Sequence, residues 1–158
     1  MTQAITHIKQ LLAKYCHRVD RGTADEVAAL FAPDAVLLPR FDGDYVVNGR
    51  SGVRDWYAHY NRNLRDGLRH LKHMIHSIEI ETDGPRAQSI CYFTACYVEG
   101  GSGKAGLCFG TYTDRLTELD GHWLFAERQI ETHIVLPQLE ALERFPSLGF
   151  PGAARSAS

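Results

Sequence analysis

An aspartate, a histidine and a tyrosine of this chain are residue types that together could carry out acid–base chemistry. Tyr15 and Asp20 lie near the end of the first expected helix, and His73 lies near the start of a long expected strand. A histidine can take a proton from carbon, a carboxylate can hold the imidazole in one tautomer, and a phenol can donate a hydrogen bond to an oxygen that gains charge. The three residues form a candidate catalytic set if the fold brings them together.

The first expected helix has one apolar face, formed at helical spacing by Ile5, Ile8, Leu12, Tyr15 and Val19. The tyrosine is therefore expected to point inward, and Asp20 flanks the apolar stripe at the end of the helix. Gly22 is expected to stop this helix. Thr23 and Glu26 then form a capping box that begins a second short helix, which Pro33 is expected to end.

The second half of the chain has the alternating pattern of β-strands. Short strands at 35–39 and 45–47 and a third helix from Ser51 are expected before it. Asp-Gly turns and a glycine-rich hairpin then predict an antiparallel meander of long strands at about 72–82, 86–99, 105–119 and 122–135. Helices first and a long sheet last predict an α+β fold, in which the curved antiparallel sheet wraps around the N-terminal helices as a cone with a pocket at its open end.

The chain is expected to form a single domain over residues 1–136, because its length of 158 residues leaves room for one core. Pro137 is expected to begin a short amphipathic helix, and a flexible tail is expected to follow as far as residue 158. The four cysteines have no paired spacing, so they are expected to be buried apolar side chains.

The composition excludes several classes of partner. A net charge of -2 and scattered basic residues argue against nucleic acid, which requires a basic surface. No apolar run approaches the roughly 20 residues of a membrane span, so no membrane partner is expected. The N-terminus lacks the apolar region of a signal peptide, and a cytoplasmic location is expected.

Several segments together are typical of one known family: the helix end at 14–22, the segments 29–35 and 48–52, the strand of His73, and the segments 110–114 and 123–128. They resemble the SnoaL-like group of the nuclear transport factor 2-like superfamily. The resemblance extends over roughly 130 residues and implies the cone-shaped α+β fold, also called a cystatin-like α+β barrel. It also implies a homodimer or higher homo-oligomer.

The resemblance implies a catalytic pair. Dehydratase and dehydrohalogenase members use an aspartate on the first helix and a histidine on the following long strand, and Asp20 and His73 match those positions. Tyr15 resembles a tyrosine found about one turn before that aspartate in several dehydratases. The expected function is a cofactor-independent lyase, in the first place a dehydratase, acting on a hydrophobic small molecule with a carbonyl or a ring.

The expected substrate-binding residues are Arg128, Tyr97, Trp56 and Tyr112. Arg128 alternates with apolar residues of the last strand, and a buried arginine is expected to pair with a carboxylate such as Asp20 or Glu127. Tyr97 stands where scytalone dehydratase carries a second pocket histidine, which puts that particular substrate in doubt.

No metal or other cofactor is expected. His70, His73 and His76 follow one another at intervals of three, but no nearby acidic residue or cysteine completes a ligand set.

Two questions stay open from the sequence. Strict alternation separates His73 from Ile78 and Ile80, so either a bulge re-aims the strand or His76 is the inward histidine. The same pocket could also serve an isomerase, a cyclase or an epoxide hydrolase. The alternative outside enzymes is a non-catalytic binding or assembly subunit, as in ring-hydroxylating dioxygenases.

Overall fold

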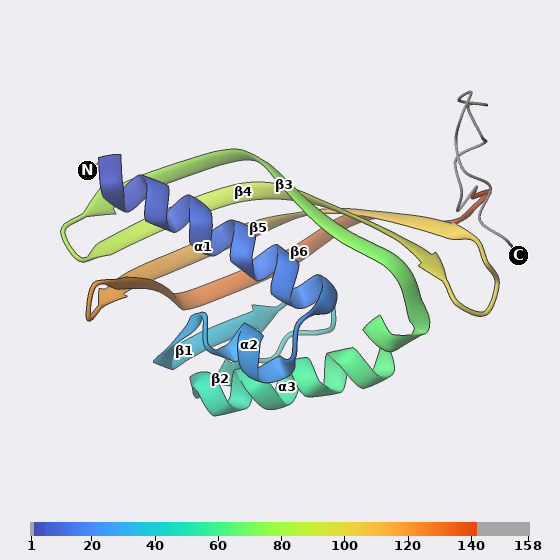
Figure 1. Cartoon of the computed structure of the whole chain (residues 1–158), viewed down its shortest axis with the longest axis horizontal. Helices are drawn as coiled ribbons and strands as arrows, with labels where there is room; N and C mark the ends of the chain where they lie inside the picture. Colours follow the sequence, from blue (N-terminus) through green and yellow to red (C-terminus); the bar gives the residue numbers. More distant parts are fainter. Residues whose placement is uncertain (1, 142–158) are drawn as a thin grey trace, which may run out of the picture.

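The computed structural model describes residues 2–141, which form helices on one side of a curved six-stranded sheet (Figure 1). The helices are α1 (Thr2–Arg21), α2 (Ala24–Ala28), α3 (Gly49–Asn63) and the 3₁₀ helix η1 (Arg65–Gly67). The strands are β1 (Phe31–Pro39), β2 (Val47–Asn48), β3 (Leu68–Asp83), β4 (Arg86–Glu99), β5 (Ala105–Leu119) and β6 (His122–Leu139).

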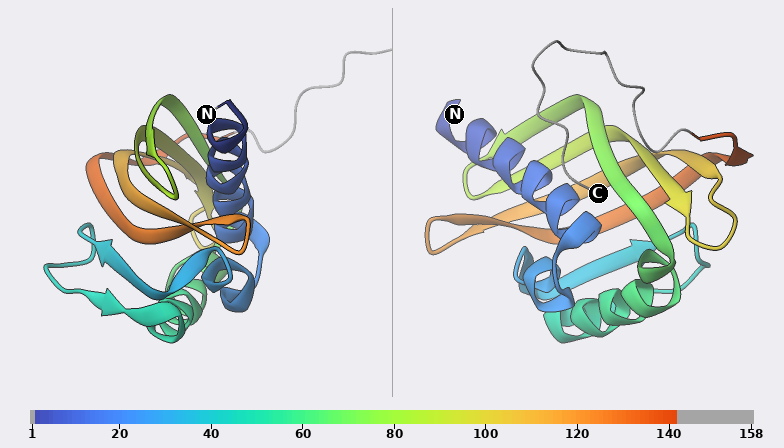
Figure 2. Two further views of the ribbon diagram at one scale, coloured as in Figure 1. Left: turned by 90° about the vertical axis from the view of Figure 1, so that its left-hand side faces the viewer. Right: turned by 45° about the vertical axis from the view of Figure 1, so that its right-hand side comes forward.

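The strands lie in the order β2-β1-β6-β5-β4-β3. The expected antiparallel meander is confirmed for β3 to β6, and β1 joins β6 as a parallel neighbour. Figure 2 shows α1 crossing the concave side of the long strands, with α2 and α3 packed at the end near β1. The expected α+β fold with a curved, unclosed sheet around the N-terminal helices is therefore confirmed.

α1 packs into the sheet along the face that its sequence predicts. Ile8, Leu12, Tyr15 and Val19 are all buried, in one cluster with Phe31 of β1 and Phe125 of β6. Each apolar side chain of this size contributes about 1.5–3 kcal/mol when it leaves water. This packing holds the C-terminal end of α1 against the start of β3.

Several expected boundaries differ from the structure. β1 begins at Phe31 rather than at residue 35, α3 begins at Gly49 rather than at Ser51, and β3 begins at Leu68 rather than at about residue 72. α2 ends at Ala28 rather than near Pro33, and Pro33 lies inside β1, where a register shift against β6 leaves it exposed. A bulge tolerates a proline because the ladder there needs no backbone donor. β6 continues through Pro137 to Leu139, where a short helix was expected, and residues 142–158 of the expected tail lie outside the described residues.

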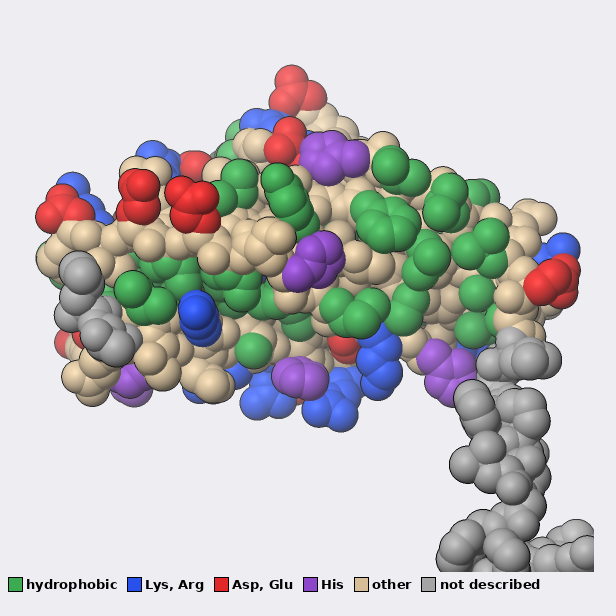
Figure 3. Space-filling model, turned by 90° about the horizontal axis from the view of Figure 1, so that it is seen from above, with side chains coloured by type: hydrophobic (Ala, Val, Ile, Leu, Met, Phe, Trp, Pro, Cys, Tyr) green, Lys and Arg blue, Asp and Glu red, His purple; other side chains and the backbone are tan. Residues whose placement is uncertain are grey.

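The convex face of the sheet is opposite to the helices. Several large apolar side chains are exposed on the long strands, among them Met74, Ile90, Tyr92, Ile134 and Leu136. Figure 3 views the molecule from the side of β3 and β4, and hydrophobic and histidine side chains lie together on this surface. None of the helices within residues 2–141 has the length and hydrophobicity that crossing a bilayer requires.

Candidate active site

Asp20 and His73 are in direct contact. The carboxylate Oδ1 of Asp20 lies 2.6 Å from Nδ1 of His73, and the backbone N–H of His73 donates to the same carboxylate at 3.2 and 3.1 Å. Each of the two side chains is only 10% exposed. When Nδ1–H donates to the carboxylate, Nε2 carries the free lone pair and is the nitrogen that can take a proton.

Bulges in β3 turn His73 inward. The register against β4 shifts between Arg69 and Lys72 and again between His76 and Glu79. Two residues within these shifts, His70 and Ser77, have positive φ angles of 57° and 53°. The second bulge places His73 on the same face as Ile75, Ile78 and Ile80.

His76 points away from this face. It is exposed, and its Nε2 lies 3.0 Å from the hydroxyl of Thr94. Of the two histidines left open by the sequence, His73 is therefore the inward one. The bulge, rather than His76, accounts for the broken alternation.

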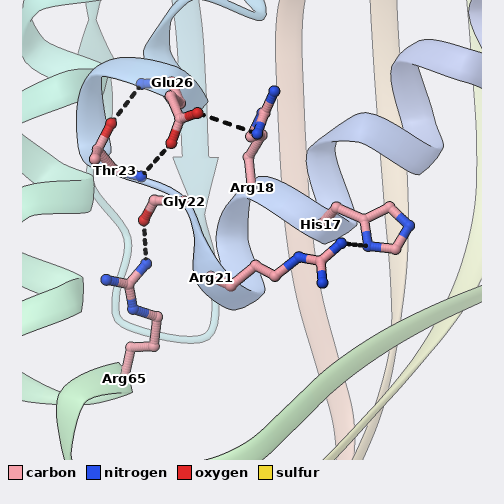
Figure 4. Close-up of polar contacts among 7 residues, drawn as sticks. All are labelled: His17, Arg18, Arg21, Gly22, Thr23, Glu26 and Arg65. Atoms are coloured by element: carbon pink, nitrogen blue, oxygen red, sulfur yellow. Dashed lines mark hydrogen bonds and ion pairs between the residues drawn. The ribbon is translucent and has the colours of Figure 1, made fainter.

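The chain that follows Asp20 is held by polar contacts at the end of α1 (Figure 4). Gly22 N–H donates to the Arg18 carbonyl at 2.7 Å, and a Cβ at Gly22 would lie only 2.8 Å from that oxygen. Arg65 donates to the Gly22 carbonyl at 2.5 Å. The expected capping box of Thr23 and Glu26 is present in both directions, so α2 begins at a fixed point directly after this turn.

A cavity of about 560 Å³ lies beside His73. Its wall is mainly aromatic and apolar, and Glu99, Arg40 and Thr132 are among its few polar members. Of the expected site residues, it brings together Tyr15, His73, Trp56, Tyr97 and Tyr112. Asp20 stands behind His73 and is not part of this wall.

Tyr15 is paired with a second tyrosine that the sequence analysis did not single out. The hydroxyls of Tyr15 and Tyr57 lie 2.5 Å apart, and both residues line the cavity. Burial raises the pKa of Tyr15, and it raises that of Tyr57 well above its usual value. Both phenols are therefore protonated at neutral pH and can donate hydrogen bonds. The sequence offered one signal for this pair. A tyrosine on the apolar face of α3 has a hydroxyl that needs a hydrogen-bond partner when it is buried.

Glycines of β5 make room for aromatic rings of β4 at the cavity wall. Tyr97 is paired across the sheet with Gly106, and a Cβ there would lie 2.3 Å from the Tyr97 ring. Phe93 is paired in the same way with Gly110, where a Cβ would lie 2.5 Å from the ring. Tyr112 stacks on Phe93 with ring centres 4.4 Å apart. The wall opposite the helices is therefore a row of aromatic rings.

Trp56 completes this wall from the side of α3. Its indole N–H donates to the hydroxyl of Tyr45 at 2.8 Å, and its ring stacks on Tyr60 with centres 5.6 Å apart. Both contacts fix the plane of the indole at the cavity.

Arg128 does not take its expected place. It is fully buried, is not among the residues that line the cavity, and binds Asp114 through two hydrogen bonds of 2.7 Å. The expected partners Asp20 and Glu127 are wrong: Glu127 binds Arg115 instead. Asp114 is the partner of Arg128 because it lies directly opposite Arg128 on the neighbouring strand. Direct contact of Arg128 with a substrate in this cavity is not supported.

The fold and the site together define a cystatin-like α+β protein with an aromatic cavity and a histidine–aspartate pair at its wall. The SnoaL-like domain family matches residues 1–129, and the chain belongs to this family. A comparison with curated proteins finds no match.

Solved structures share the fold. The chain is similar to a variant of Rv3472, a Mycobacterium tuberculosis protein of unknown function, at 25% identity and a TM-score of 0.72, with 84% of this chain and 78% of that chain covered. It is similar to a candidate scytalone dehydratase from Novosphingobium aromaticivorans at 19% identity and a TM-score of 0.74, covering 92% and 100%. A hexachlorocyclohexane dehydrochlorinase, LinA type 2, has 18% identity and a TM-score of 0.74, covering 96% of each chain.

Proposed function

We propose that the protein is a cofactor-independent lyase, in the first place a dehydratase, that acts on a hydrophobic small molecule with a carbonyl or a ring. One observation carries the proposal: the 2.6 Å contact between Asp20 and His73 at the wall of an aromatic cavity. Membership of the SnoaL-like family supports it. So do similar folds in a candidate dehydratase and a dehydrochlorinase, whose names both denote elimination reactions.

In the proposed reaction His73 acts first as a base and then as an acid. Nε2 takes the proton from the carbon next to an electron-withdrawing group, and the Asp20 carboxylate stabilises the imidazolium that forms. Tyr15 donates to the substrate oxygen that gains charge. The imidazolium then returns its proton to the departing hydroxyl, which leaves as water, so both groups depart from one face of the substrate.

The cavity favours a ring system as substrate. Trp56, Tyr97 and Tyr112 present aromatic rings, and a volume of about 560 Å³ can hold a molecule of a few fused rings. These residues are the proposed binding surface. A non-catalytic subunit would be expected to fill its cone with apolar side chains and to leave Asp20 and His73 apart, and neither property fits the geometry.

The test uses bicyclic ketones because the aromatic cavity favours a ring system beside a carbonyl. The protein is incubated with a panel of bicyclic β-hydroxyketones, and products are analysed by mass spectrometry for the loss of one water. In parallel, 2-tetralone is incubated in D₂O, and exchange of the protons next to its carbonyl is followed by NMR.

Each outcome of these experiments decides between the candidate functions. Water loss and proton exchange that both vanish in His73→Ala are expected. Exchange catalysed without water loss for any member of the panel would favour the isomerase alternative. Wild-type rates equal to those of His73→Ala in both assays would refute proton abstraction by this site.

We also propose that the protein forms a homodimer through the convex face of the sheet. Exposed apolar side chains on a sheet face are unfavourable in water unless a partner covers them. Light scattering should give twice the mass of the chain, and Ile90→Lys combined with Tyr92→Lys should give the single mass. A monomeric wild type would disprove this proposal and leave the catalytic one untouched.

A further inference from the structure

A row of polar residues crosses the concave side of the sheet beneath α1. Ser89 of β4, Asp114 of β5 and Arg128 of β6 are direct neighbours across adjacent strands. Ser89 donates to Asp114 at 3.1 Å, and Asp114 accepts two hydrogen bonds from Arg128. The side chains of Asp114 and Arg128 are both 0% exposed. A complete ion pair is therefore sealed in the core, next to the cavity but outside it.

The guanidinium of Arg128 is surrounded by aromatic rings. Its central carbon lies 4.0 Å from the ring centres of Tyr15 and of Phe125 and 4.3 Å from that of Tyr112. Its Nη1 is buried and has no hydrogen-bond partner within the described residues. On this side the cation therefore interacts with the faces of the rings.

Stability alone does not explain this arrangement. Taking two charges out of water costs several kcal/mol per ion, and apolar residues of similar volume often fill such a site equally well or better. Of the two tyrosines next to Arg128, only Tyr15 has its hydroxyl paired with another phenol at the cavity. A role that involves Tyr15 would account for a buried charge at this position.

Tyr15 and Tyr57 differ in their position relative to Arg128. The central carbon of Arg128 lies 4.0 Å from the centre of the Tyr15 ring, and among the described residues Tyr57 is not one of the rings that this cation contacts. Burial raises the pKa of both phenols, and Arg128 opposes this rise in both. Either hydroxyl can be the donor in the contact between them. The arrangement in which Tyr57 donates to the Tyr15 oxygen leaves the Tyr15 proton for a ligand in the cavity.

We propose that Arg128 is a positioning residue that acts through Tyr15. Asp114 holds the Arg128 cation against the face of the Tyr15 ring. The cation fixes the ring and strengthens the Tyr15 hydroxyl as a donor to an anionic oxygen in the cavity. Tyr57 donates a hydrogen bond to the Tyr15 oxygen. This inference rests on the proposed function, because it assumes that Tyr15 faces a substrate oxygen that gains charge. It assigns the site a preference for ligands with an enolate-like or phenolate oxygen.

The test measures binding of 4-nitrophenolate by its absorption, so it requires no turnover. The whole row is replaced at once by Ser89→Ala, Asp114→Leu and Arg128→Met, which leaves no buried charge or hydroxyl without a partner. We expect this variant to fold and to bind the probe about tenfold more weakly, as Tyr15→Phe alone should. Adding Tyr15→Phe to the triple variant should cost clearly less than the sum of the two separate losses, because both changes act on the same donor.

A matched control lies in the next row of the same two strands. Arg115 and Glu127 form an ion pair there, and the Arg115 side chain is 65% exposed. Arg115→Met with Glu127→Leu should bind the probe like the wild type. Arg128→Lys is the second variant if the triple one does not fold, and it should weaken binding because lysine cannot match the planar, bidentate pairing.

Three results would overturn the inference. The first is a wild type that does not bind the probe. The second is a triple variant, or Arg128→Lys if that one is needed, that binds the probe like the wild type. The third is a loss of probe affinity in the combined variant that equals the sum of the losses in the triple variant and in Tyr15→Phe. A failure of catalysis in the ketone assays with normal probe binding would instead refute the proposed function and leave the role of Arg128 standing as a binding property.

Discussion

One carboxylate–cation pair joins the end of α1 to β3, another lies on the sheet beneath α1, and the two are built in opposite ways. Asp20 and His73 meet at the edge of the cavity, each about a tenth exposed, and the cation of this pair exists only when the imidazole is protonated. Asp114 and Arg128 are sealed from solvent. Burial alone would lower the pKa of Arg128, but Asp114 raises it well above its usual value, so this cation is permanent.

The difference suggests a division of tasks around Tyr15. A proton can be gained and lost only where a titratable group reaches the cavity, and His73 meets that condition. A permanent charge is useful where an oxygen must be stabilised without a proton moving. Arg128, which lies against the Tyr15 ring, supplies such a charge. Substitutions in the two pairs should therefore have different consequences for turnover and for stability.

The largest expected effect is the loss of turnover in His73→Ala. Removing the base should lower the rate of dehydration or proton exchange by about 10²–10⁴-fold, with the folded state retained. His76→Ala is the matched control, because His76 lies on the same strand, points to the convex face and binds Thr94. Kinetics of both variants with the same ketone, together with their circular dichroism spectra, make the comparison. Equal losses in the two variants would remove His73 from the mechanism.

Arg128→Met alone should mainly affect stability. It leaves the Asp114 carboxylate buried without its counter-ion, which typically costs about 3–5 kcal/mol. Urea unfolding of the single variant and of the triple variant at Ser89, Asp114 and Arg128 measures this cost. The triple variant should recover most of the loss, because no charge remains. A single variant as stable as the wild type would mean that water reaches Asp114.

Asp20→Asn should have the opposite effect to Arg128→Met: a large loss of turnover and a small loss of stability. An amide can still accept the His73 backbone N–H, but it cannot stabilise the imidazolium, so turnover should fall by about 10²-fold or more. Because the amide oxygen can still accept from both the backbone N–H and Nδ1–H of His73, the free energy of unfolding should change by only about 1 kcal/mol. A stability loss as large as that of Arg128→Met would show that the two pairs do not differ as proposed.

The sequence predicted the long strands well because Asp-Gly turns and alternating residues fix both their ends and their faces. The family resemblance indicated His73, but the alternation of residues could not place it, since β3 inverts its alternation at Ser77, a residue with a positive φ angle of 53° and no local signal for it. The partner of Arg128 was hidden for a similar reason. Counting back from the turn at Asp120 pairs Asp114 with Glu127, and only the register shift near Arg115 moves it to Arg128.

The smallest effect concerns Cys16 and Cys91, which report how well the core around Arg128 is sealed. Burial raises the pKa of Cys16 to about 11 and that of Cys91 to about 12, although Arg128 opposes the rise in both. In the unfolded chain these thiols ionise with a pKa of about 8.5. The unfolded state therefore loses protons first, and stability falls as the pH rises from about 8.5 towards the folded values of about 11 and 12.

Urea unfolding at pH 8 and pH 9.5 should show this decline before the tyrosines contribute to it, because in the unfolded chain they ionise only near their ordinary pKa of 10.0. Cys16→Ala with Cys91→Ala should flatten the dependence in that interval. A thiol reagent at pH 8 should leave both cysteines unmodified in the folded protein and label them in urea. Rapid labelling of the folded protein would mean that solvent reaches this core, and the contrast between the sealed and the accessible pair would then disappear.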